Sequence, residues 1–341
     1  MYHTKKIICT ISLCLLFSSL CFSRQMGTAE DINRRLGRGI NMGTTFEAPS
    51  EDGWGNPWKP EYFKIMADLG FSHVRVPVRW ELDYRSLEQP PYTISPAFFE
   101  RIKTVVDEAL KNKLHIVINM HHHEELLQEP LEQKERFLSQ WKQIADYFKN
   151  YPDSLVFEIL NEPNGNLTPE IWNTFASEAL SIMRETNPDR TIMIAPADWS
   201  SVGGLAKLQL PKDSNLILTV HYYNPFYFTH QGITWGHPIP PVGVKWNDTE
   251  EEREAILNDF ELVEEFSREH KIPIHIGEFG TYEKADMDSR TRWATFLSRF
   301  FDERGYSWAY WEFSSLFGIY NPADKTFYEP LLNALIPESE K

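Results

Sequence analysis

Cysteine is absent from this 341-residue sequence after position 21, since its three cysteines are Cys9, Cys14 and Cys21. A chain that lost its first residues would therefore contain no disulfide and no thiolate metal site. Its stability must come from its hydrophobic core, and residues 24–341 are numerous enough to bury one. Positive charge is also scarce: 34 Lys and Arg face 49 Asp and Glu, a formal net charge of −15. Such a chain repels nucleic acid and anionic lipid and suits a neutral substrate.

Long apolar runs are missing, except for one at the start of the chain. Residues 7–22 are mostly apolar and follow Lys5 and Lys6, and Cys21 and Ser23 are small residues at the −3 and −1 positions of a cleavage site after Ser23. We expect a signal peptide over residues 1–23 and a secreted product, periplasmic or extracellular. A lipid anchor on Cys21 is an alternative, but Leu20 is a poor residue before a lipidated cysteine. The run is shorter than the roughly 20 residues of a membrane-spanning helix, so we expect no membrane span.

No linker or repeat interrupts residues 30–337, and we interpret residues 30–341 as one catalytic domain. Short apolar runs, rich in Val and Ile, alternate with segments of helical periodicity, the pattern of parallel strands buried on both faces. This pattern predicts an α/β fold, a (β/α)8 TIM barrel. A doubly wound sheet is the alternative, but no Gly-x-Gly-x-x-Gly follows the first run. The runs cover residues 39–43, 73–78, 114–120, 155–160, 191–195, 216–220, 274–276 and 307–311, and the helical segments 59–69, 96–111, 131–149, 169–186, 250–270, 288–304 and 330–335.

Two glutamates follow apolar runs at the predicted rim of the barrel, where active sites of this fold lie. Glu162 follows the fourth run and Glu278 follows the seventh. Each alone is equally compatible with a helix cap or a solvated loop charge. Two facing carboxylates are what glycosidic cleavage requires, one protonated to assist the leaving oxygen and one ionised. The pair therefore predicts a glycoside hydrolase.

Other polar residues also fall at or within the predicted strands. Arg75 lies inside the second run and needs a buried partner, either a structural or a catalytic carboxylate. His121, His122 and His123 follow the third run, but adjacent strand residues alternate faces and cannot all reach one metal ion. We predict substrate contacts for these histidines, and no metal or cofactor.

Six motifs in barrel order resemble glycoside hydrolase family 5, the family of endoglucanases and mannanases, over about residues 36–335. Asn-Glu-Pro alone is a weak signal, whereas six ordered motifs are specific. The motifs are His73-Val74-Arg75-Val76-Pro77, Ile118-Asn119-Met120-His121-His122, Leu160-Asn161-Glu162-Pro163, Val220-His221-Tyr222-Tyr223, Ile276-Gly277-Glu278-Phe279-Gly280 and Tyr310-Trp311-Glu312.

The resemblance implies a retaining double displacement without cofactor, with Glu162 as acid/base and Glu278 as nucleophile. It implies that Arg75 and Tyr223 contact the nucleophile and that His221 tunes the acid. It further implies that Asn161 binds the sugar 2-hydroxyl and that His121, His122 and Asn41 lie near the sugar. The resemblance also implies that the indole ring of Trp311 packs against the face of that sugar. We predict a strained, cis peptide at this residue.

Aromatic residues make up 14% of the chain, with eleven Trp, and aromatic faces suit the apolar faces of sugar rings. Phe226, His230 and Trp235 are expected on the leaving-group side, and Trp54 and Trp58 as an outer platform, unless they only pack their loops. We predict a monomeric, retaining endo-β-1,4-glucanase that acts on cellulose-like or mixed-linkage β-glucan. An endo-β-1,4-mannanase or a dual enzyme is the main alternative, and xyloglucan is a further candidate substrate. A glycan-binding protein without catalytic activity is a remote alternative.

Overall fold

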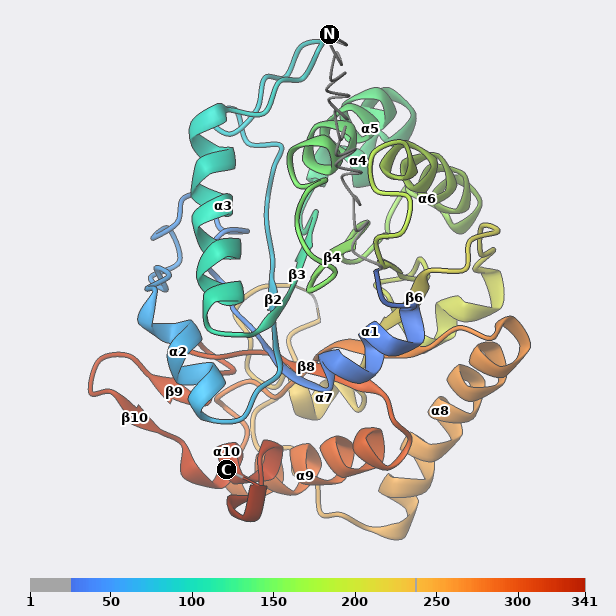
Figure 1. Ribbon diagram of the computed structural model, residues 1–341. Helices are drawn as coiled ribbons and strands as arrows, with labels where there is room; N and C mark the ends of the chain where they lie inside the picture. The colour runs from blue at the N-terminus through green and yellow to red at the C-terminus, as the bar shows by residue number, and fades with distance from the viewer. Residues whose placement is uncertain (1–25, 237, 341) are drawn as a thin grey trace, which may run out of the picture.

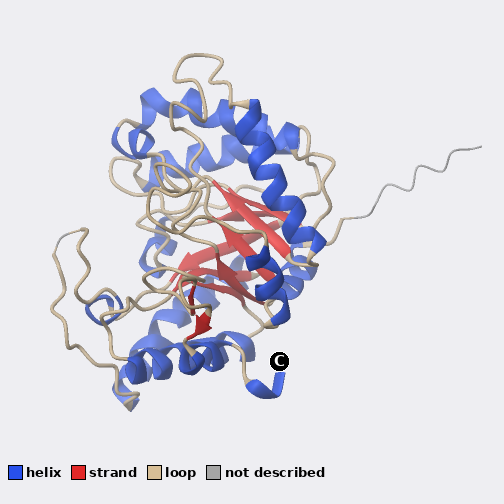
Figure 2. Ribbon diagram, turned by 90° about the vertical axis from the view of Figure 1, so that its left-hand side faces the viewer, coloured by secondary structure: helices blue, strands red, loops and turns tan. Residues whose placement is uncertain are grey.

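The computed structural model describes residues 26–236 and 238–340, so the expected signal peptide lies outside the described residues. Eight parallel strands form a closed barrel in sequence order, with the last strand paired to the first. Helices surround the strands (Figures 1 and 2). The predicted (β/α)8 barrel is thus confirmed, with strands β1 (Arg38–Asn41), β2 (His73–Val76), β3 (His115–Asn119), β4 (Leu155–Glu158), β5 (Ile192–Ile194), β6 (Leu216–His221), β7 (Ile274–Phe279) and β8 (Ser307–Tyr310).

The predicted amphipathic segments form the outer helices, and local sequence signals set where several of them begin. Pro occupies the first helical turn of α3, α5 and α6, where its missing N–H is not needed. Helix α8 begins with a capping box between Thr249 and Glu252. These helices are α2 (Glu61–Asp68), α3 (Pro96–Lys111), α5 (Pro130–Tyr147), α6 (Pro169–Arg184), α8 (Glu250–His270), α9 (Met287–Glu303) and α10 (Glu329–Leu335).

Several short elements were not predicted. The connection after β5 forms the 3-10 helix η1 instead of a regular barrel helix. A two-stranded antiparallel sheet of β9 and β10 follows β8. The unpredicted elements are α1 (Ala29–Leu36), α4 (Glu124–Gln128), η1 (Val202–Lys207), α7 (Phe226–Thr229), β9 (Tyr320–Asn321), β10 (Thr326–Phe327) and η2 (Glu338–Glu340).

Helix α1 lies across the base of the barrel, near the centre of the ring of helices in Figure 1. Its apolar side chains form one buried cluster with side chains from four strands, and burial of this kind contributes about 25 cal/mol per Å² of apolar area. The helix therefore closes the end of the barrel away from the strand termini that carry Glu162 and Glu278. The cluster consists of Ala29, Ile32, Leu36, Val117, Val156, Met193 and Ile217.

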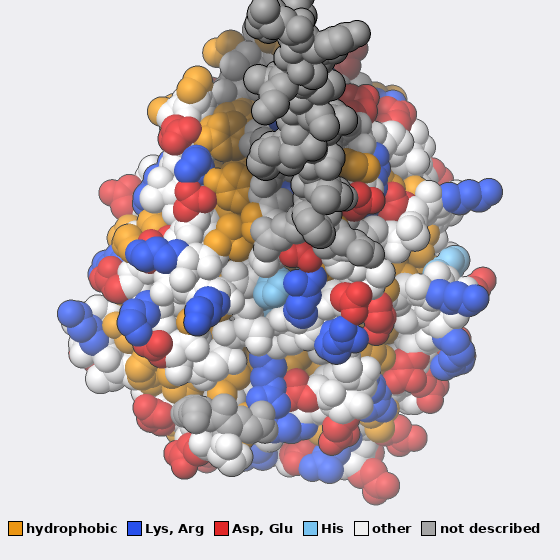
Figure 3. Space-filling view, viewed as in Figure 1, with side chains coloured by type: hydrophobic (Ala, Val, Ile, Leu, Met, Phe, Trp, Pro, Cys, Tyr) orange, Lys and Arg blue, Asp and Glu red, His pale blue; other side chains and the backbone are white. Residues whose placement is uncertain are grey.

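Acidic and basic side chains are both spread over the face seen in Figure 3. Among the residues that the structure describes, no helix is both long enough and apolar enough to cross a membrane.

Candidate active site

Glu162 and Glu278, from opposite sides of the barrel rim, are brought together by the fold. His221, the last residue of β6, lies between them: its Nδ1 is 2.8 Å from Glu162 Oε1 and 3.7 Å from Glu278 Oε2. One carboxylate oxygen of each glutamate lies within 4.8 Å of the other. Retaining glycosidases hold their two carboxyl groups about 5–5.5 Å apart, and inverting ones about 6.5–9.5 Å apart. The spacing fits the retaining reaction.

Arg75, fully buried in β2, is the charged centre of the site. It donates to Glu278 Oε1 at 2.7 Å and to both oxygens of Glu158 at 2.6 and 3.0 Å. The two partners considered from the sequence, a structural and a catalytic carboxylate, are therefore both present. Glu158 was not predicted, although a carboxylate in the apolar run of β4 was a usable signal, since it too needs a buried partner.

The surroundings shift the pKa of each titratable group in the pair. Burial raises the pKa of Glu162 to about 7, while Arg75 opposes the rise. Burial also raises the pKa of Glu278, and His221 and Arg75 oppose that shift by stabilising the carboxylate. The pKa of His221 is lowered by burial, which favours the neutral ring. A neutral carboxyl at Glu162 and a carboxylate held by Arg75 at Glu278 match an acid and a nucleophile.

Tyr223 also contacts the nucleophile candidate, as the resemblance implied. Its hydroxyl donates to Glu278 Oε2 at 3.0 Å. Its ring packs edge-on against His230, 4.8 Å between centroids. Both oxygens of Glu278 therefore receive a hydrogen bond, which orients the carboxylate before substrate arrives.

The two asparagines expected near the sugar differ in position. Asn161 Oδ1 accepts from Arg75 at 2.6 Å, which leaves its amide N–H group as the donor for a sugar hydroxyl. Asn41 is fully buried, and its Nδ2 is used by the carbonyl oxygens of Gly277, Ala309 and Tyr310. The predicted sugar contact of Asn41 is therefore wrong. Its Oδ1 instead accepts from Arg75 at 2.8 Å, so it helps to position the guanidinium.

Trp311 lies at the rim with His121 stacked on it at a centroid distance of 5.7 Å and 9° between planes. The expected cis peptide is confirmed at the Trp311–Glu312 bond. A Cβ on Gly43 would lie 2.7 Å from the indole ring, so the absence of a side chain at Gly43 allows the segment after β1 to approach the tryptophan.

The other histidines and outer aromatics divide into exposed and buried groups. His122 packs against Trp54, which is 48% exposed and available as a platform. Trp58 is only 5% exposed and packs between Phe46 and Phe63 in the main core. The prediction of an outer platform at Trp58 is therefore wrong, because the loop folds its ring inward.

The long loop after β6 carries the aromatics expected on the leaving-group side. Phe226 stacks on His230 at 4.4 Å between centroids, and Phe226 and Trp235 are 41% and 46% exposed. Trp235 packs edge-on against Tyr282. These rings are available to contact a substrate beyond Tyr223.

Trp199 was missed by the sequence analysis. It is 56% exposed, and its backbone N–H donates to Pro163 O, next to Glu162. Asp198, Trp199 and Ser200 all have positive φ, a conformation that costs free energy in non-glycine residues and that tertiary contacts must maintain. No local pattern in the sequence indicates such a turn.

A second buried acidic pair lies beside Trp311. Glu47 accepts from the backbone N–H groups of Thr44 and Thr45, and Glu312 contacts the Thr44 hydroxyl at 3.4 Å. Burial raises the pKa of Glu47 to about 7 and that of Glu312 well above its usual value, with Glu47 adding to the latter shift. Neither carboxyl forms a salt bridge within residues 26–236 and 238–340.

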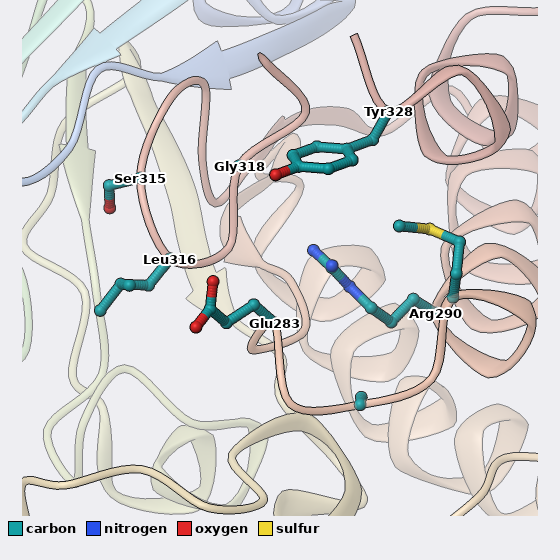
Figure 4. Close-up of a pocket in the computed structure, with 8 residues that line it drawn as sticks. Glu283, Arg290, Ser315, Leu316, Gly318 and Tyr328 are labelled. Carbon is teal, nitrogen blue, oxygen red and sulfur yellow. The ribbon is translucent and has the colours of Figure 1, made fainter. Parts of the chain in front are cut away.

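A cavity of about 270 Å³ lies outside this site, behind the loop after β8 (Figure 4). Arg290 borders it and donates to Thr281 Oγ1 and to Phe317 O, so it supports that loop. Phe317 in turn packs against Tyr223 on the other side of the loop. None of the predicted site residues lines the cavity.

Of the described residues, the group best arranged to hold a metal ion is Glu162, His221 and Glu278, with ligand atoms within 4.8 Å of one another. Arg75 and Tyr223 already donate to both oxygens of Glu278. This hydrogen bonding suits a carboxylate that reacts with substrate. His121, His122 and His123 lie after the end of β3 and not within a strand, so the alternation of strand faces does not apply to them. The rings of His121 and His122 pack edge-on at 4.7 Å between centroids, and His122 also contacts Trp54.

Comparison with known proteins identifies relatives for nearly the whole chain. It is 38% identical to Endoglucanase H of Acetivibrio thermocellus over 89% of its own length, and 32% identical to Endoglucanase B of Ruminococcus albus over 78%. The chain spans 33% of the first relative and 68% of the second, and 38% of the Cellulase/esterase CelE of Acetivibrio thermocellus.

Solved structures with the same barrel include the endoglucanase Cel5A of Thermotoga maritima, at 48% identity and a TM-score of 0.89. The match covers 91% of this chain and 100% of that one. The same protein was solved in complex with mannotriose, at a TM-score of 0.88 over 90% of this chain and 100% of that one. The family model of cellulases, glycosyl hydrolase family 5, matches residues 37–316. With this match and the paired glutamates at the ends of β4 and β7, the chain belongs to the cellulase family, glycosyl hydrolase family 5.

Proposed function

We propose that this protein is a retaining endo-β-1,4-glucanase that cleaves internal bonds of cellulose-like or mixed-linkage β-glucan. The observation that carries the proposal is the pairing of Glu162 and Glu278 across His221, with oxygens within 4.8 Å. The endoglucanases among the relatives support the glucan substrate.

In the first step, a Glu278 oxygen attacks the anomeric carbon as the bond from that carbon to the leaving oxygen breaks. Glu162 donates its proton to the leaving oxygen, and a covalent glycosyl-enzyme forms. In the second step, Glu162, now a carboxylate, takes a proton from water. The resulting hydroxide oxygen attacks the anomeric carbon, releases Glu278 and leaves Glu162 protonated again.

The surrounding residues serve these steps in defined ways. Arg75 and Tyr223 hold Glu278 ionised and oriented for attack. The amide of Asn161 donates to the sugar 2-hydroxyl, a contact that strengthens in the transition state. Trp311 supports the sugar on the non-reducing side of the cut, beside His121.

A dual glucanase and mannanase is the second candidate. The observation that favours it is the complex of Thermotoga maritima Cel5A with mannotriose, because that protein shares 48% of its sequence with this chain. Glucose and mannose units differ only at C2, so few contacts decide between them. A glycan-binding protein without activity is disfavoured by the complete set of hydrogen bonds around Glu278.

The substrate is tested by incubating the purified protein with carboxymethyl cellulose, barley β-glucan and galactomannan and measuring reducing ends. We expect release from the two glucans. Comparable release from galactomannan establishes the dual enzyme, and no release from any of the three refutes the glucanase.

The role of Glu162 is tested with the Glu162→Gln variant. Loss of the acid slows the glycosylation step on polysaccharide by about 10²–10⁴-fold, the usual contribution of a general acid. An aryl glycoside with a good leaving group needs less protonation, so its first step is slowed less. Equal slowing on both substrates would contradict the assignment.

We also propose that the protein is exported with cleavage after Ser23 and acts as a monomer outside the cytoplasm. The support is the basic start and apolar run of residues 1–23. N-terminal sequencing of the protein from culture supernatant or periplasm tests the cleavage site, and an intact Met1 on the exported protein would refute it. Light scattering of the pure protein tests the oligomeric state.

A further inference from the structure

A column of buried polar side chains runs through the barrel interior below Glu162. His221 and Thr219 lie two residues apart on β6, and Thr219 pairs in register with His275 of β7. His275 in turn pairs with Ser307 of β8. Ser307 donates to Asn33 of α1, the helix that closes the base. We call these side chains the polar column; in order from the rim to the base they are Glu162, His221, Thr219, His275, Ser307 and Asn33.

Hydrogen bonds at the lower end of the column set the direction of its protons. Asn33 Nδ2 donates to Gly305 O, so the atom facing the Ser307 hydroxyl at 2.7 Å is Oδ1, which only accepts. The single proton of the Ser307 hydroxyl is therefore used, and its oxygen accepts from His275 Nδ1 at 2.7 Å. Neutral His275 then has its proton on Nδ1 and a lone pair on Nε2.

His73, the histidine nearest to His275, cannot supply a donor to this lone pair. The two rings lie 5.3 Å apart, and His73 Nδ1 contacts the carbonyl oxygen of Leu36 at 2.7 Å. A carbonyl only accepts, so the His73 proton is on Nδ1 and its Nε2 also carries a lone pair. Burial lowers the pKa of His73 to about 3 and that of His275 well below its usual value, so both rings are neutral.

The upper end of the column has a matching requirement. Before substrate binds, the O–H of a protonated Glu162 needs an acceptor, and His221 Nδ1 lies 2.8 Å from its Oε1. The same proton passes to the leaving oxygen once substrate is bound. For Nδ1 to accept, the proton of the neutral ring must be on Nε2. The Glu278 carboxylate, 3.7 Å from Nδ1, favours the opposite arrangement with the proton on Nδ1. Something else must therefore hold the proton on Nε2.

Thr219 is placed to do so. Thr219 Oγ1, His221 Nε2 and His275 Nε2 are all buried and have no hydrogen-bond partner in the part of the chain that the structure describes. A Cβ on Gly277 would lie 2.7 Å from Thr219 Oγ1 and 3.0 Å from His221 Nε2, so both atoms point at the same glycine. A hydroxyl supplies one donor and two acceptor positions, which is what the two nitrogens require.

We propose that the Thr219 hydroxyl, through internal water, accepts the Nε2–H of His221 and donates to His275 Nε2, and so holds His221 as the tautomer whose Nδ1 accepts the proton of Glu162 in the free enzyme. This inference rests on the proposed role of Glu162 as the acid. Thr219 is then a positioning residue for the catalytic proton. Once Glu162 has donated that proton, the Nδ1 lone pair does not stabilise the carboxylate, which therefore stays basic enough to deprotonate water.

Other groups around His221 do not carry out this function. Arg75 and Glu158 are tied together by their own ion pair, and Tyr223 donates to Glu278. His121 is neutral, because burial lowers its pKa well below the usual value. The titratable and charged groups facing His221 are thus Arg75 of β2, His121 after β3, Glu158 and Glu162 of β4 and its end, Tyr223 after β6, and His275 and Glu278 of β7.

The proposal is tested with Thr219→Val, which keeps the shape but removes the hydroxyl, and with Thr219→Ser, which retains it. Thr191→Val is the matched control, because Thr191 is also buried, immediately before β5, and its hydroxyl likewise has no hydrogen-bond partner among the described residues. We measure kcat/KM on barley β-glucan against pH. In Thr219→Val the population of the Nδ1–H tautomer of His221 rises. Its Nδ1–H donates to the Glu162 carboxylate and lowers the pKa of Glu162. The fall of kcat/KM at high pH, the alkaline limb of the profile, should therefore move down by about 0.5–1 pH unit.

Thr219→Ser and Thr191→Val should show the alkaline limb of kcat/KM at the same pH as the wild type. KM at acid pH should be unchanged in all three variants. An identical limb in Thr219→Val and the wild type would overturn the proposal.

Nitrogen NMR of 15N-histidine protein reports the tautomer independently of activity, with His221 assigned by comparison with His221→Gln. We expect the proton of wild-type His221 on Nε2. A proton on Nδ1 overturns the proposal even where Thr219→Val fails to fold. A wild-type enzyme that has the Nε2–H tautomer but no alkaline limb would instead support the polar column and refute Glu162 as the acid.

Discussion

Glu47 offers a test of how burial, rather than ion pairing, sets the pH dependence of stability. Its side chain is 1% exposed and accepts from the backbone N–H groups of Thr44 and Thr45, and burial raises its pKa from 4.5 to about 7. The folded protein therefore binds more protons than the unfolded chain between these two values. The stability that the neutral carboxyl provides is complete below pH 4.5 and is lost as pH rises to 7.

The magnitude follows from the shift. A change of one pKa unit corresponds to about 1.36 kcal/mol, so 2.5 units correspond to about 3.4 kcal/mol over the whole range. Between pH 5 and pH 8 the loss is about 2.5 kcal/mol, because the unfolded carboxyl is already partly ionised at pH 5. Glu47→Gln removes this loss, since the amide stays neutral. It also removes one acceptor, at a cost of about 1 kcal/mol that does not depend on pH.

The assay is the unfolding temperature of the wild type and of Glu47→Gln at pH 5 and pH 8. One kcal/mol moves Tm by roughly 2 °C in a chain of this size. The variant should therefore gain about 5 °C on the wild type when pH rises from 5 to 8, whatever its offset at pH 5. Glu254→Gln, on the exposed surface of α8, is the control and should show no such gain. An equal Tm difference at both pH values would refute the assignment of a neutral, buried carboxyl.

Three further outcomes are expected. Glu278→Gln should abolish turnover with Tm retained, because the amide is a poor nucleophile, and substantial remaining activity in a reducing-end assay would contradict its role. The kcat/KM of the wild type should fall above about pH 7, since Glu162 must be protonated to act as the acid and burial raises its pKa to that value; a profile that stays flat to pH 9 would contradict this. Arg75→Met should lose about 3–5 kcal/mol of stability in a urea titration, because Glu158 and Glu278 are left as unpaired buried charges; a loss below 1 kcal/mol would show that they are neutral in the folded state.

The barrel was predictable because a parallel strand buried on both faces needs a nearly continuous apolar run, which is visible in one dimension. The positions of Glu162 and Glu278 followed from the same pattern, since the carboxyl ends of barrel strands meet at one rim. Arg75 was recognisable as a residue that needs a partner, and Glu158 satisfies the same criterion in β4.

The elements missed were those that depend on contacts between distant segments. Helix α1 is short, and its formation depends on Ile32 and Leu36 packing on side chains from four strands. The positive φ angles around Trp199 are maintained by contacts with Pro163 and with the strand ends. Helix formation over eight residues is marginal without such packing.

The sequence by itself determined the fold class and the two carboxylates, because hydrophobic periodicity and strand ends are local properties. Only the tertiary structure decided which side chains face the substrate. Trp54 and Trp58 are four residues apart and equal in chemistry, yet one is exposed and the other is in the core. Asn41 and Asn161 both lie at the carboxyl end of a strand, β1 and β4 respectively. The amide nitrogen of Asn41, however, already donates to three carbonyl oxygens. Burial and hydrogen bonding depend on what the rest of the chain places beside a residue, and the residue type alone does not specify that.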